Sequence, residues 1–316
     1  MMDCLELRQA LLEEFYQLAG IQKRPWLQRL VKRLLAKPLD RFVDIALQFD
    51  QLVEKEGFTT AARWALPRFV RGLYVRGLEK IPREGPLLLT ANHPGAVDSL
   101  LIPACLPRSD LRILASGLTF FRKLPSLHRY LIFTPRQGSG RALAAREAIR
   151  HLQSGGALLI YPSGGVDPDP AFLSEARQYF ERWSESLTLF LRRAPRTMVQ
   201  TVICSHVLLE KYFRHPLTRL GDTLRKRLVI AEYLQMADQL LRRQKERWLP
   251  YLSFGDPLPG EELLSSDSFH VLYRMVQAAQ HLLDEHINLG KERFTLLPLS
   301  ADEPLALPAH VQRGDG

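Results

Sequence analysis

From Leu73 onward the chain repeats one pattern, in which short apolar runs are bounded by glycine or proline and helical stretches separate several of them. The runs lie at 74–75, 87–89, 111–115, 131–134, 157–161, 201–204 and 251–254, and helical spacing fills, for example, 141–152. Strands that alternate with helices are typical of α/β proteins, in which helices cover the faces of a sheet. We therefore predict an α/β fold with a mixed sheet flanked by helices.

The first 70 residues differ from this pattern because their apolar positions follow a helical spacing. One helix is predicted from Leu5 to Leu18 and three more at about 26–35, 40–49 and 59–71, with Asp40 capping the third. We therefore predict an N-terminal helical domain at 1–70 and an α/β domain at 71–297. The second domain contains a basic helical insertion at about 207–248, and a loosely ordered tail is expected at 298–316.

The composition and net charge of the chain limit which partners and which cellular compartment we expect for it. The 316 residues carry a formal net charge of +9, which favours acidic partners. No nucleic-acid recognition motif accompanies this charge, so no nucleic-acid partner is expected. The three cysteines are far apart and no His/Cys cluster indicates a metal, which predicts free thiols in a reducing cytoplasm. Neither a secretory signal nor a run of ~18 apolar residues is found, so we expect a cytoplasmic protein, free or peripheral on the inner face of the membrane.

An Asn92–His93 pair follows the apolar run at 87–89, and a carboxylate, Asp98, follows five residues after the histidine. Residues five apart on a regular helix point about 140° away from each other, so the two side chains meet only if the chain turns between them. Pro94–Gly95 supplies such a turn. An imidazole oriented by a carboxylate is suited to remove the proton of a hydroxyl group. Taken alone, the block is equally consistent with a histidine that only caps or packs.

Two further blocks follow strands. The strand at 131–134 leads to Arg136 and then to a glycine-containing loop that ends at Arg141. Exposed amides at a helix start beside two guanidinium groups predict an anion pocket, although a solvated loop is an alternative. The strand at 157–161 leads to Ser163, Gly164 and Gly165, where glycine permits close backbone approach to a ligand. A tight surface turn is the other interpretation of this third block.

The order and spacing of these blocks resemble the glycerol-3-phosphate and lysophospholipid acyltransferase superfamily. That family is marked by NHxxxxD, a strand ending in arginine, a Pro-Glu-Gly block and an apolar strand, and the resemblance covers about 74–205. The third block departs from it, because Ser163 stands where most relatives carry glutamate and no arginine follows Gly165. The positions that match the first two blocks are Asn92, His93, Asp98, Phe133 and Arg136.

The altered third block resembles that of the soluble plastid-type glycerol-3-phosphate acyltransferases. These enzymes carry a similar Pro-Ser-Gly-Gly sequence and an N-terminal helical bundle. In that subgroup, arginines just after the second glycine help to bind the acceptor phosphate. Val166 occupies the first such position here. A phosphate on the acceptor must therefore be held by Lys123, Arg136 or Arg141.

The resemblance implies a glycerolipid acyltransferase-like fold and an O-acyltransferase that needs no cofactor beyond its acyl donor. The donor would be acyl carrier protein or acyl-CoA, and the acceptor glycerol-3-phosphate or a lysophospholipid. His93 would be the general base, oriented by Asp98, and amides near Gly164 and Gly165 are candidates for the oxyanion donor. The expected substrate-binding residues are Asn92, Lys123, Arg136, Arg141, Ser163, Gly164 and Gly165. The alternative is a non-catalytic lipid- or anion-binding protein that keeps the fold, which the altered positions Ser163 and Val166 favour.

Basic residues cluster on one predicted helix near the N-terminus. Six basic residues and no acidic ones lie at 22–38, while Trp26, Leu27 and Leu30 belong to the opposing helical face. This pattern is typical of a helix that lies on an anionic membrane, but also of a bundle helix with a solvated basic face. Two further basic groups, at 225–227 and 242–248, are candidates for docking an acidic carrier protein or a lipid headgroup.

Overall fold

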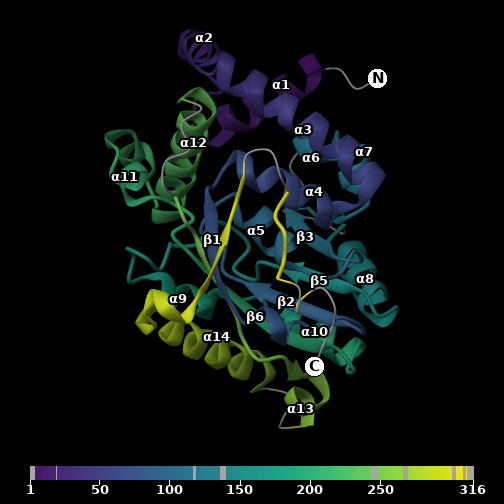
Figure 1. Ribbon diagram of the computed structural model, residues 1–316. Coiled ribbons are helices and arrows are strands. Elements are labelled where there is room, and N and C mark those ends of the chain that lie inside the picture. Colours follow the sequence, from purple (N-terminus) through teal and green to yellow (C-terminus); the bar gives the residue numbers. More distant parts are fainter. Residues whose placement is uncertain are drawn as a thin grey trace.

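The structure is a computed structural model that describes residues 4–18, 20–116, 119–135, 140–242, 248–265, 270–300, 304–308 and 311. Its centre is one nine-stranded mixed sheet with helices on both faces (Figure 1). The predicted α/β class and the helical N-terminal region are both confirmed. The strands are β1 (Gly72–Arg76), β2 (Leu87–Ala91), β3 (Arg112–Ser116), β4 (Leu131–Thr134), β5 (Ala157–Ile160), β6 (Met198–Ser205), β7 (Tyr251–Phe254), β8 (Leu258–Pro259) and β9 (Thr295–Pro298).

The strand order puts the end of β2, which leads into Asn92 and His93, in the middle of the sheet. The order is β4-β3-β5-β2-β6-β7-β1-β9, and β8 pairs with β6 outside this path. The run β4-β3-β5-β2-β6 is parallel, with Leu89 of β2 level with Leu159 of β5 and Gln200 of β6. β7 is antiparallel to β6 but parallel to β1, and β9 is antiparallel to β1. The carboxyl ends of β5, β2 and β6 therefore meet at one edge, where open α/β sheets bind ligands.

The two faces of the sheet belong to two hydrophobic cores. Successive side chains of a strand point to opposite faces. Accordingly Leu87 and Leu89 of β2 lie in a core with α3 (Ala36–Glu56), α4 (Phe58–Ala65) and α5 (Asp98–Cys105). Leu88 lies in a core with α8 (Gly140–Gln153), α10 (Ser186–Arg193) and α14 (Val271–Asn288). Because both faces are covered, β2 is apolar at every position from 87 to 89 and β5 at every position from 157 to 160. This is why both strands are continuous apolar runs in the sequence.

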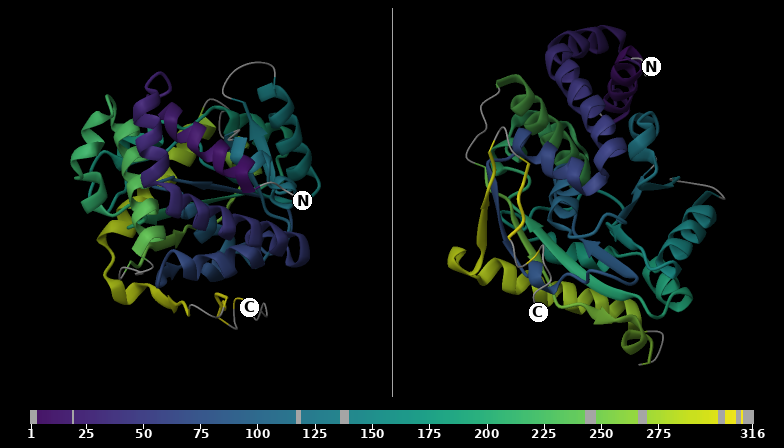
Figure 2. Two further views of the ribbon diagram at one scale, coloured as in Figure 1. Left: turned by 90° about the horizontal axis from the view of Figure 1, so that it is seen from above. Right: turned by 45° about the vertical axis from the view of Figure 1, so that its right-hand side comes forward.

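The first two helices of the chain lie beyond one end of the sheet, as Figure 2 shows, whereas the next two pack into the core on one of its faces. The structure corrects the expected start of the third helix, because Asp40 lies inside it rather than capping it. The helix begins at Ala36 and keeps Pro38 in its first turn, where a missing N–H costs no hydrogen bond. These elements are α1 (Cys4–Leu18), α2 (Pro25–Leu34), α3 (Ala36–Glu56), α4 (Phe58–Ala65) and the 3₁₀ turn η1 (Leu66–Arg68).

The basic segment after β6 forms separate helices, of which α12 is the longest. It packs against α3 and touches α1, and the Arg41 guanidinium donates to the carbonyl of Leu241 at 2.9 Å. Leu305, Leu307 and Val311 of the expected tail are buried. The division into domains stays a prediction. The remaining helices are η2 (Leu78–Lys80), α5 (Asp98–Cys105), α6 (Thr119–Arg122), α7 (Pro125–His128), α8 (Gly140–Gln153), α9 (Ala176–Tyr179), η3 (Phe180–Arg182), α10 (Ser186–Arg193), α11 (Glu210–Phe213), η4 (Pro216–Leu220), α12 (Leu224–Arg242), α13 (Gly260–Ser265), α14 (Val271–Asn288) and η6 (Lys291–Arg293).

Candidate active site

Asn92 joins the ends of two central strands directly beside the site. Its side-chain amide donates to the carbonyl of Cys204 at 2.8 Å, and its side-chain carbonyl accepts the backbone N–H of Cys204 at 2.8 Å. The side chain is buried, and both of its polar groups are used in these two bonds. Asn92 therefore fixes the exit of the chain from β2 against β6, and so fixes where the next residue, His93, begins.

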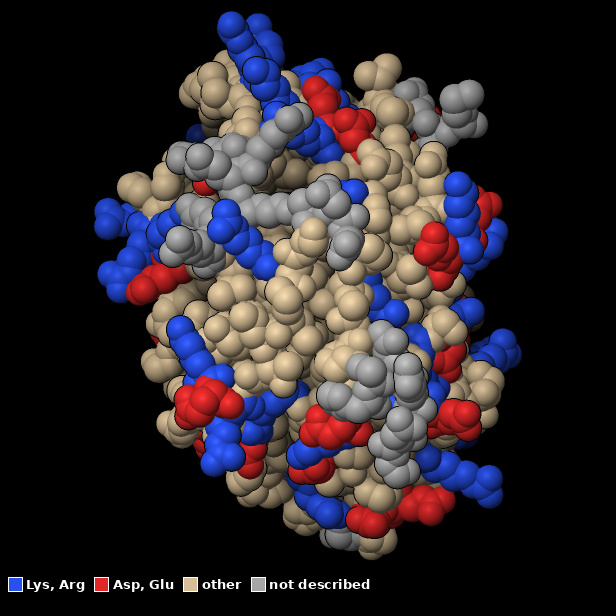
Figure 3. Space-filling view, viewed as in Figure 1, with Lys and Arg blue, Asp and Glu red and all other residues tan. Residues whose placement is uncertain are grey.

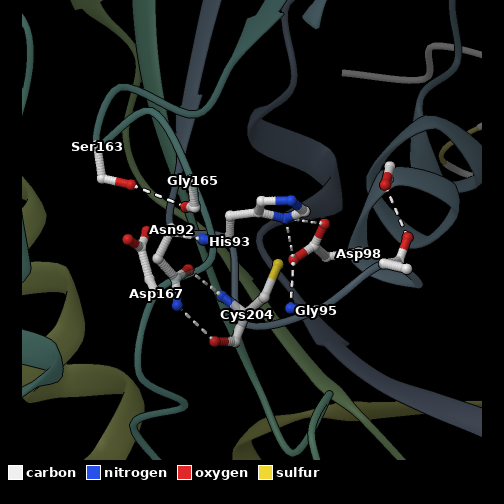
Figure 4. Close-up of polar contacts among 10 residues, drawn as sticks. Asn92, His93, Gly95, Asp98, Ser163, Gly165, Asp167 and Cys204 are labelled. Carbon is white, nitrogen blue, oxygen red and sulfur yellow. Dashed lines mark hydrogen bonds and ion pairs between the residues drawn. The ribbon is translucent and has the colours of Figure 1, made fainter. Parts of the chain in front are cut away.

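His93 and Asp98 meet as their spacing predicts. The Nδ1 atom of His93 lies 2.9 and 3.0 Å from the two carboxylate oxygens of Asp98, as Figure 4 shows. Asp98 is the first residue of α5, and its carboxylate also accepts the N–H of Gly95 at 3.2 Å. The carboxylate is fully buried, whereas the His93 side chain keeps 22% of its exposure. Among the described residues, no side chain or backbone group bonds Nε2 of His93, which leaves this atom for a ligand.

The third block holds His93 from the other side. The backbone N–H of His93 donates to the Asp167 carboxylate at 3.0 Å, and the backbone N–H of Asp167 donates to the His93 carbonyl at 2.7 Å. The Tyr161 ring stacks on the imidazole, with 4.3 Å between the ring centroids. The imidazole is therefore fixed at its backbone, at Nδ1 and on one face.

The glycine turn of the third block is covered by an arginine from a distant helix. The Arg225 guanidinium donates to the carbonyls of Val166 at 3.2 Å and Ser163 at 3.1 Å, and lies 3.8 Å from the Asp167 carboxylate. A Cβ atom on Gly165 would lie 2.9 Å from the carbon of this guanidinium, so a side chain there would displace Arg225. Ser163 donates to the Gly165 carbonyl at 3.0 Å.

Asp169 ties the third block to the loop after β6. Its buried carboxylate accepts the backbone N–H groups of His206, Val207 and Leu208 at 2.7 to 3.0 Å. His206 has a φ of 54°, a left-handed conformation that is uncommon without glycine. The carboxylate thereby fixes the path of the chain from β6 into α11 and α12.

The charges around His93 favour its protonated form. Burial lowers the pKa of His93, but the negative charges of Asp98, Glu232 and Asp167 outweigh burial and raise the pKa to about 9. Burial raises the pKa of the Asp167 carboxyl to about 6 and that of Glu232 to about 7. The imidazole of the free protein therefore carries a proton at neutral pH, and its capacity to accept another group's proton increases as the pH rises toward 9.

Two of the three cations expected at an acceptor phosphate, Lys123 and Arg141, bond groups outside the dyad. The Lys123 ammonium pairs with the Glu6 carboxylate of α1 at 2.8 Å. Arg141 is exposed at the start of α8 and donates to the Pro135 carbonyl at 3.3 Å. Arg136 lies outside the described residues. Gly164 has a φ of 74° and donates its N–H to the Tyr161 carbonyl at 3.0 Å, which leaves the N–H of Gly165 as the candidate oxyanion donor.

Sequence reasoning missed Tyr161 and Asp167, which contact His93, Arg225, which contacts the third block, and Glu232, whose charge acts on the His93 pKa. Tyr161 and Asp167 flank the Pro-Ser-Gly-Gly sequence, and that position was the available signal for them. Arg225 and Glu232 lie in a helix far along the chain and carry no local motif. Within the described ranges, no group of three or more His, Cys, Asp or Glu residues is placed to hold a metal ion.

One comparison with known proteins concerns the part of the chain that contains the dyad. The sequence model of the Acyltransferase family matches residues 72–205. The chain is also similar to the crystal structure of the 1-acyl-sn-glycerophosphate (LPA) acyltransferase PlsC from Thermotoga maritima, with 16% identity and a TM-score of 0.44. That similarity covers 90% of this chain and 97% of the other. No curated protein matches the chain. The family match begins at β1 and ends at β6, and it contains His93, Asp98 and the third block.

Proposed function

We propose that this chain, whose residues 72–205 match the sequence model of the Acyltransferase family, is a glycerolipid O-acyltransferase. The protein transfers a fatty acyl group from an acyl thioester to a hydroxyl of glycerol-3-phosphate or a lysophospholipid. The observation that carries the proposal is the His93–Asp98 pair, in which the imidazole is partly exposed and its Nε2 atom has no hydrogen-bond partner among the described residues. A purely binding role gives no reason for a histidine oriented in this way.

The geometry supports direct transfer to the acceptor. Nε2 of His93 accepts the proton of the acceptor hydroxyl while the hydroxyl oxygen attacks the thioester carbonyl carbon. The resulting tetrahedral intermediate collapses with cleavage of the C–S bond, and the proton on His93 passes to the leaving thiolate. Asp98 keeps a proton on Nδ1, so that Nε2 is the basic atom, and stabilises the imidazolium that forms. The N–H of Gly165 is the candidate donor to the oxyanion.

The experiment that tests this function measures thiol release from acyl-CoA and from acylated carrier protein. We expect release that depends on glycerol-3-phosphate or on a lysophospholipid, with the acylated acceptor as product. An Arg136→Ala variant is expected to raise the acceptor KM more than the donor KM, because a guanidinium at a strand end suits an anionic group. Unchanged acceptor kinetics in Arg136→Ala would instead point to Lys123 or Arg141 as the residue that holds the phosphate.

Two outcomes would contradict parts of this proposal. Binding of lipid without thiol release, across the whole acceptor panel, would favour the non-catalytic alternative that Ser163 and Val166 suggest. Turnover with only uncharged alcohols would agree with the proposed acyl transfer but contradict the proposed phosphate-bearing acceptor. That result would fit the absence of an arginine at position 166.

Helix α2 supports a peripheral membrane location. None of its residues is buried. Leu27 and Val31 pack against a small core formed by Leu12 and its neighbours, which uses part of the apolar face. Trp26 and Leu30, four residues apart, remain 63% and 47% exposed, and Leu34 is 64% exposed. Basic side chains gather at this end of the molecule in Figure 3. None of the described helices is long and apolar enough to span a bilayer.

We propose that α2 lies on the anionic inner surface of a membrane, with Trp26 and Leu30 in the interface. A Lys32→Glu/Arg33→Glu variant is expected to lose most binding to vesicles with anionic lipid, since each basic residue near such a surface contributes about 1 kcal/mol. The control is Arg192→Glu/Arg193→Glu at the end of α10, which changes the net charge equally. Co-sedimentation at low and high salt is the measurement. Equal binding by both variants, or binding that salt does not weaken, would leave α2 as a bundle helix with a solvated face.

A further inference from the structure

Asp167 binds both backbone polar groups of His93. Its carboxylate accepts the His93 N–H at 3.0 Å, and its own N–H donates to the His93 carbonyl at 2.7 Å. The second distance lies at the short end of the range for an N–H···O bond. A group that fixes Asp167 therefore also fixes the backbone from which the imidazole of the dyad extends.

Arg225 acts on Asp167 in two ways. Its Nε atom donates to the carbonyl of Val166 at 3.2 Å, and this carbonyl shares one peptide group with the Asp167 N–H. A donor at the oxygen of a peptide group polarises the group and strengthens the bond that its N–H makes. The Arg225 guanidinium also lies 3.8 Å from Oδ1 of Asp167, a buried atom with no hydrogen-bond partner among the described residues. Burial raises the pKa of the Asp167 carboxyl to about 6, and the Arg225 charge acts in the opposite direction, which favours the carboxylate form.

The glycine turn that precedes Asp167 is fixed by the same guanidinium. The Nη2 atom of Arg225 donates to the Ser163 carbonyl at 3.1 Å, while the Ser163 hydroxyl donates to the Gly165 carbonyl at 3.0 Å. Gly165 leaves the space that the guanidinium fills, since a Cβ atom there would lie 2.9 Å from the guanidinium carbon. The carbonyls of residues 163, 165 and 166 thus all accept a hydrogen bond, which fixes the path of the chain into Asp167.

Helix α12, which carries Arg225, is also attached to the protein elsewhere. The Gln235 side chain donates to the carbonyl of Val207 at 2.9 Å and accepts the Leu209 N–H at 2.8 Å. The helix also packs against α3 and α11. The Arg225 side chain itself is 35% exposed. A substitution at Arg225 should therefore leave α12 in place and change its contacts with the third block.

We propose that Arg225 is a positioning residue for His93, which acts through the Val166 carbonyl and Asp167 to fix the backbone of the catalytic base. The catalytic meaning of this role rests on the proposed function, but the contacts themselves do not. A general base must lie within hydrogen-bond reach of the proton that it removes. A displaced His93 should therefore slow the chemical step more than it weakens substrate binding.

Hydrogen exchange of single backbone amides, measured by NMR, tests these contacts directly. Arg225→Met removes the charge and the donors but keeps an unbranched side chain. We expect the N–H groups of His93 and Asp167 to exchange roughly tenfold faster in this variant, because the bonds that protect them are weakened. The Cys204 N–H, which bonds the Asn92 side chain, is the internal reference and should exchange as in the wild type.

The matched control is Arg214→Met on α11, which removes the same charge at an exposed arginine that pairs with Glu210 at 2.6 Å. It should leave the exchange rates of His93 and Asp167 unchanged. Faster exchange of the Cys204 reference together with the other two amides would show general loosening of the sheet and would overturn a specific role of Arg225.

Two further variants change the same contact differently. Gly165→Ala places a methyl group where the guanidinium lies, at a backbone conformation that alanine can adopt, and should again speed the exchange of the Asp167 N–H. If Arg225→Met fails to fold, Arg225→Lys carries the test, because the ammonium keeps the charge but lacks the planar fork of donors. The Asp167 N–H should exchange faster in that variant as well.

The kinetic constants add a readout that a contact serving only to anchor α12 would not change. In Arg225→Met the kcat of acyl transfer should fall by about 10- to 100-fold, with little change in the donor and acceptor KM values. A rise in either KM with an unchanged kcat would overturn the positioning role and would make Arg225 a group that binds substrate itself.

The outcomes separate this inference from the proposed function. Faster exchange at His93 and Asp167 in a protein that releases no thiol supports the contacts of Arg225 and overturns acyl transfer. Acyl transfer with unchanged exchange rates and an unchanged kcat in Arg225→Met overturns the role of Arg225 and leaves the His93–Asp98 mechanism intact.

Discussion

Replacing His93 with alanine is expected to lower acyl transfer by about 10²–10⁴-fold, because the variant lacks the imidazole that we propose as the base beside Asp98. The side chain is partly exposed and no described group hydrogen-bonds its Nε2 atom, so the fold should persist. Loss of the imidazole does leave the buried Asp98 carboxylate with the Gly95 N–H as its remaining donor. His93→Gln, which can still offer an N–H near Asp98, is therefore the companion variant.

The measurement is the rate of thiol release at saturating donor and acceptor, together with the far-UV spectrum and the melting temperature of each variant. Both variants should be folded and equally inactive. Activity within about twofold of the wild type in either of them would show that His93 is not the base.

Replacing Asp98 with asparagine is the second large effect. The carboxylate accepts from Nδ1 of His93, which fixes the tautomer that leaves Nε2 basic. An asparagine can instead donate to Nδ1 through its amide and favour the opposite tautomer, and in a well-studied protease triad the same change costs about 10⁴-fold. We expect a fall in kcat of roughly 10²–10⁴-fold with little change in the KM values. The His93 pKa should also fall, because the nearest negative charge is lost.

A double variant provides the control for this prediction. If the two residues act as one unit, His93→Ala/Asp98→Asn should be no slower than His93→Ala alone. A rise in acceptor KM with an unchanged kcat in Asp98→Asn would instead assign Asp98 to substrate binding.

The sequence was most informative where both faces of a strand are covered. Runs such as 87–89 and 157–160 are apolar at every position because helices pack on both sides, and the predicted strands there are confirmed. The contact between His93 and Asp98 could also be predicted, since Pro94–Gly95 indicates a turn between the two residues. The strand Thr295–Pro298 was missed, because it is only four residues long, ends in proline and pairs with a strand, β1, that is distant in the sequence.

Long-range contacts explain the other differences. Nothing local in the α12 sequence distinguishes Arg225 from its neighbours Lys226 and Arg227, and only the packed structure shows which one points at Ser163. Glu232 is likewise one acidic residue in a basic helix. The start of α3 was misplaced because Asp40 is a good capping residue, whereas the helix begins at Ala36 and the residue before it, Leu35, makes no side-chain capping bond.

The strand order has a consequence for any attempt to isolate the segment that carries the family match. That segment begins with β1, yet the partners of β1 are β7 and β9, which both come after residue 205. A fragment that ends at β6 would leave β1 unpaired and would expose a free edge of β6 that β7 covers in the whole chain. We therefore expect β1 and the last strands of the chain to unfold together in one cooperative transition. Proteolytic removal of about the last quarter of the chain should then disrupt the site, although the removed residues lie far from it in the sequence.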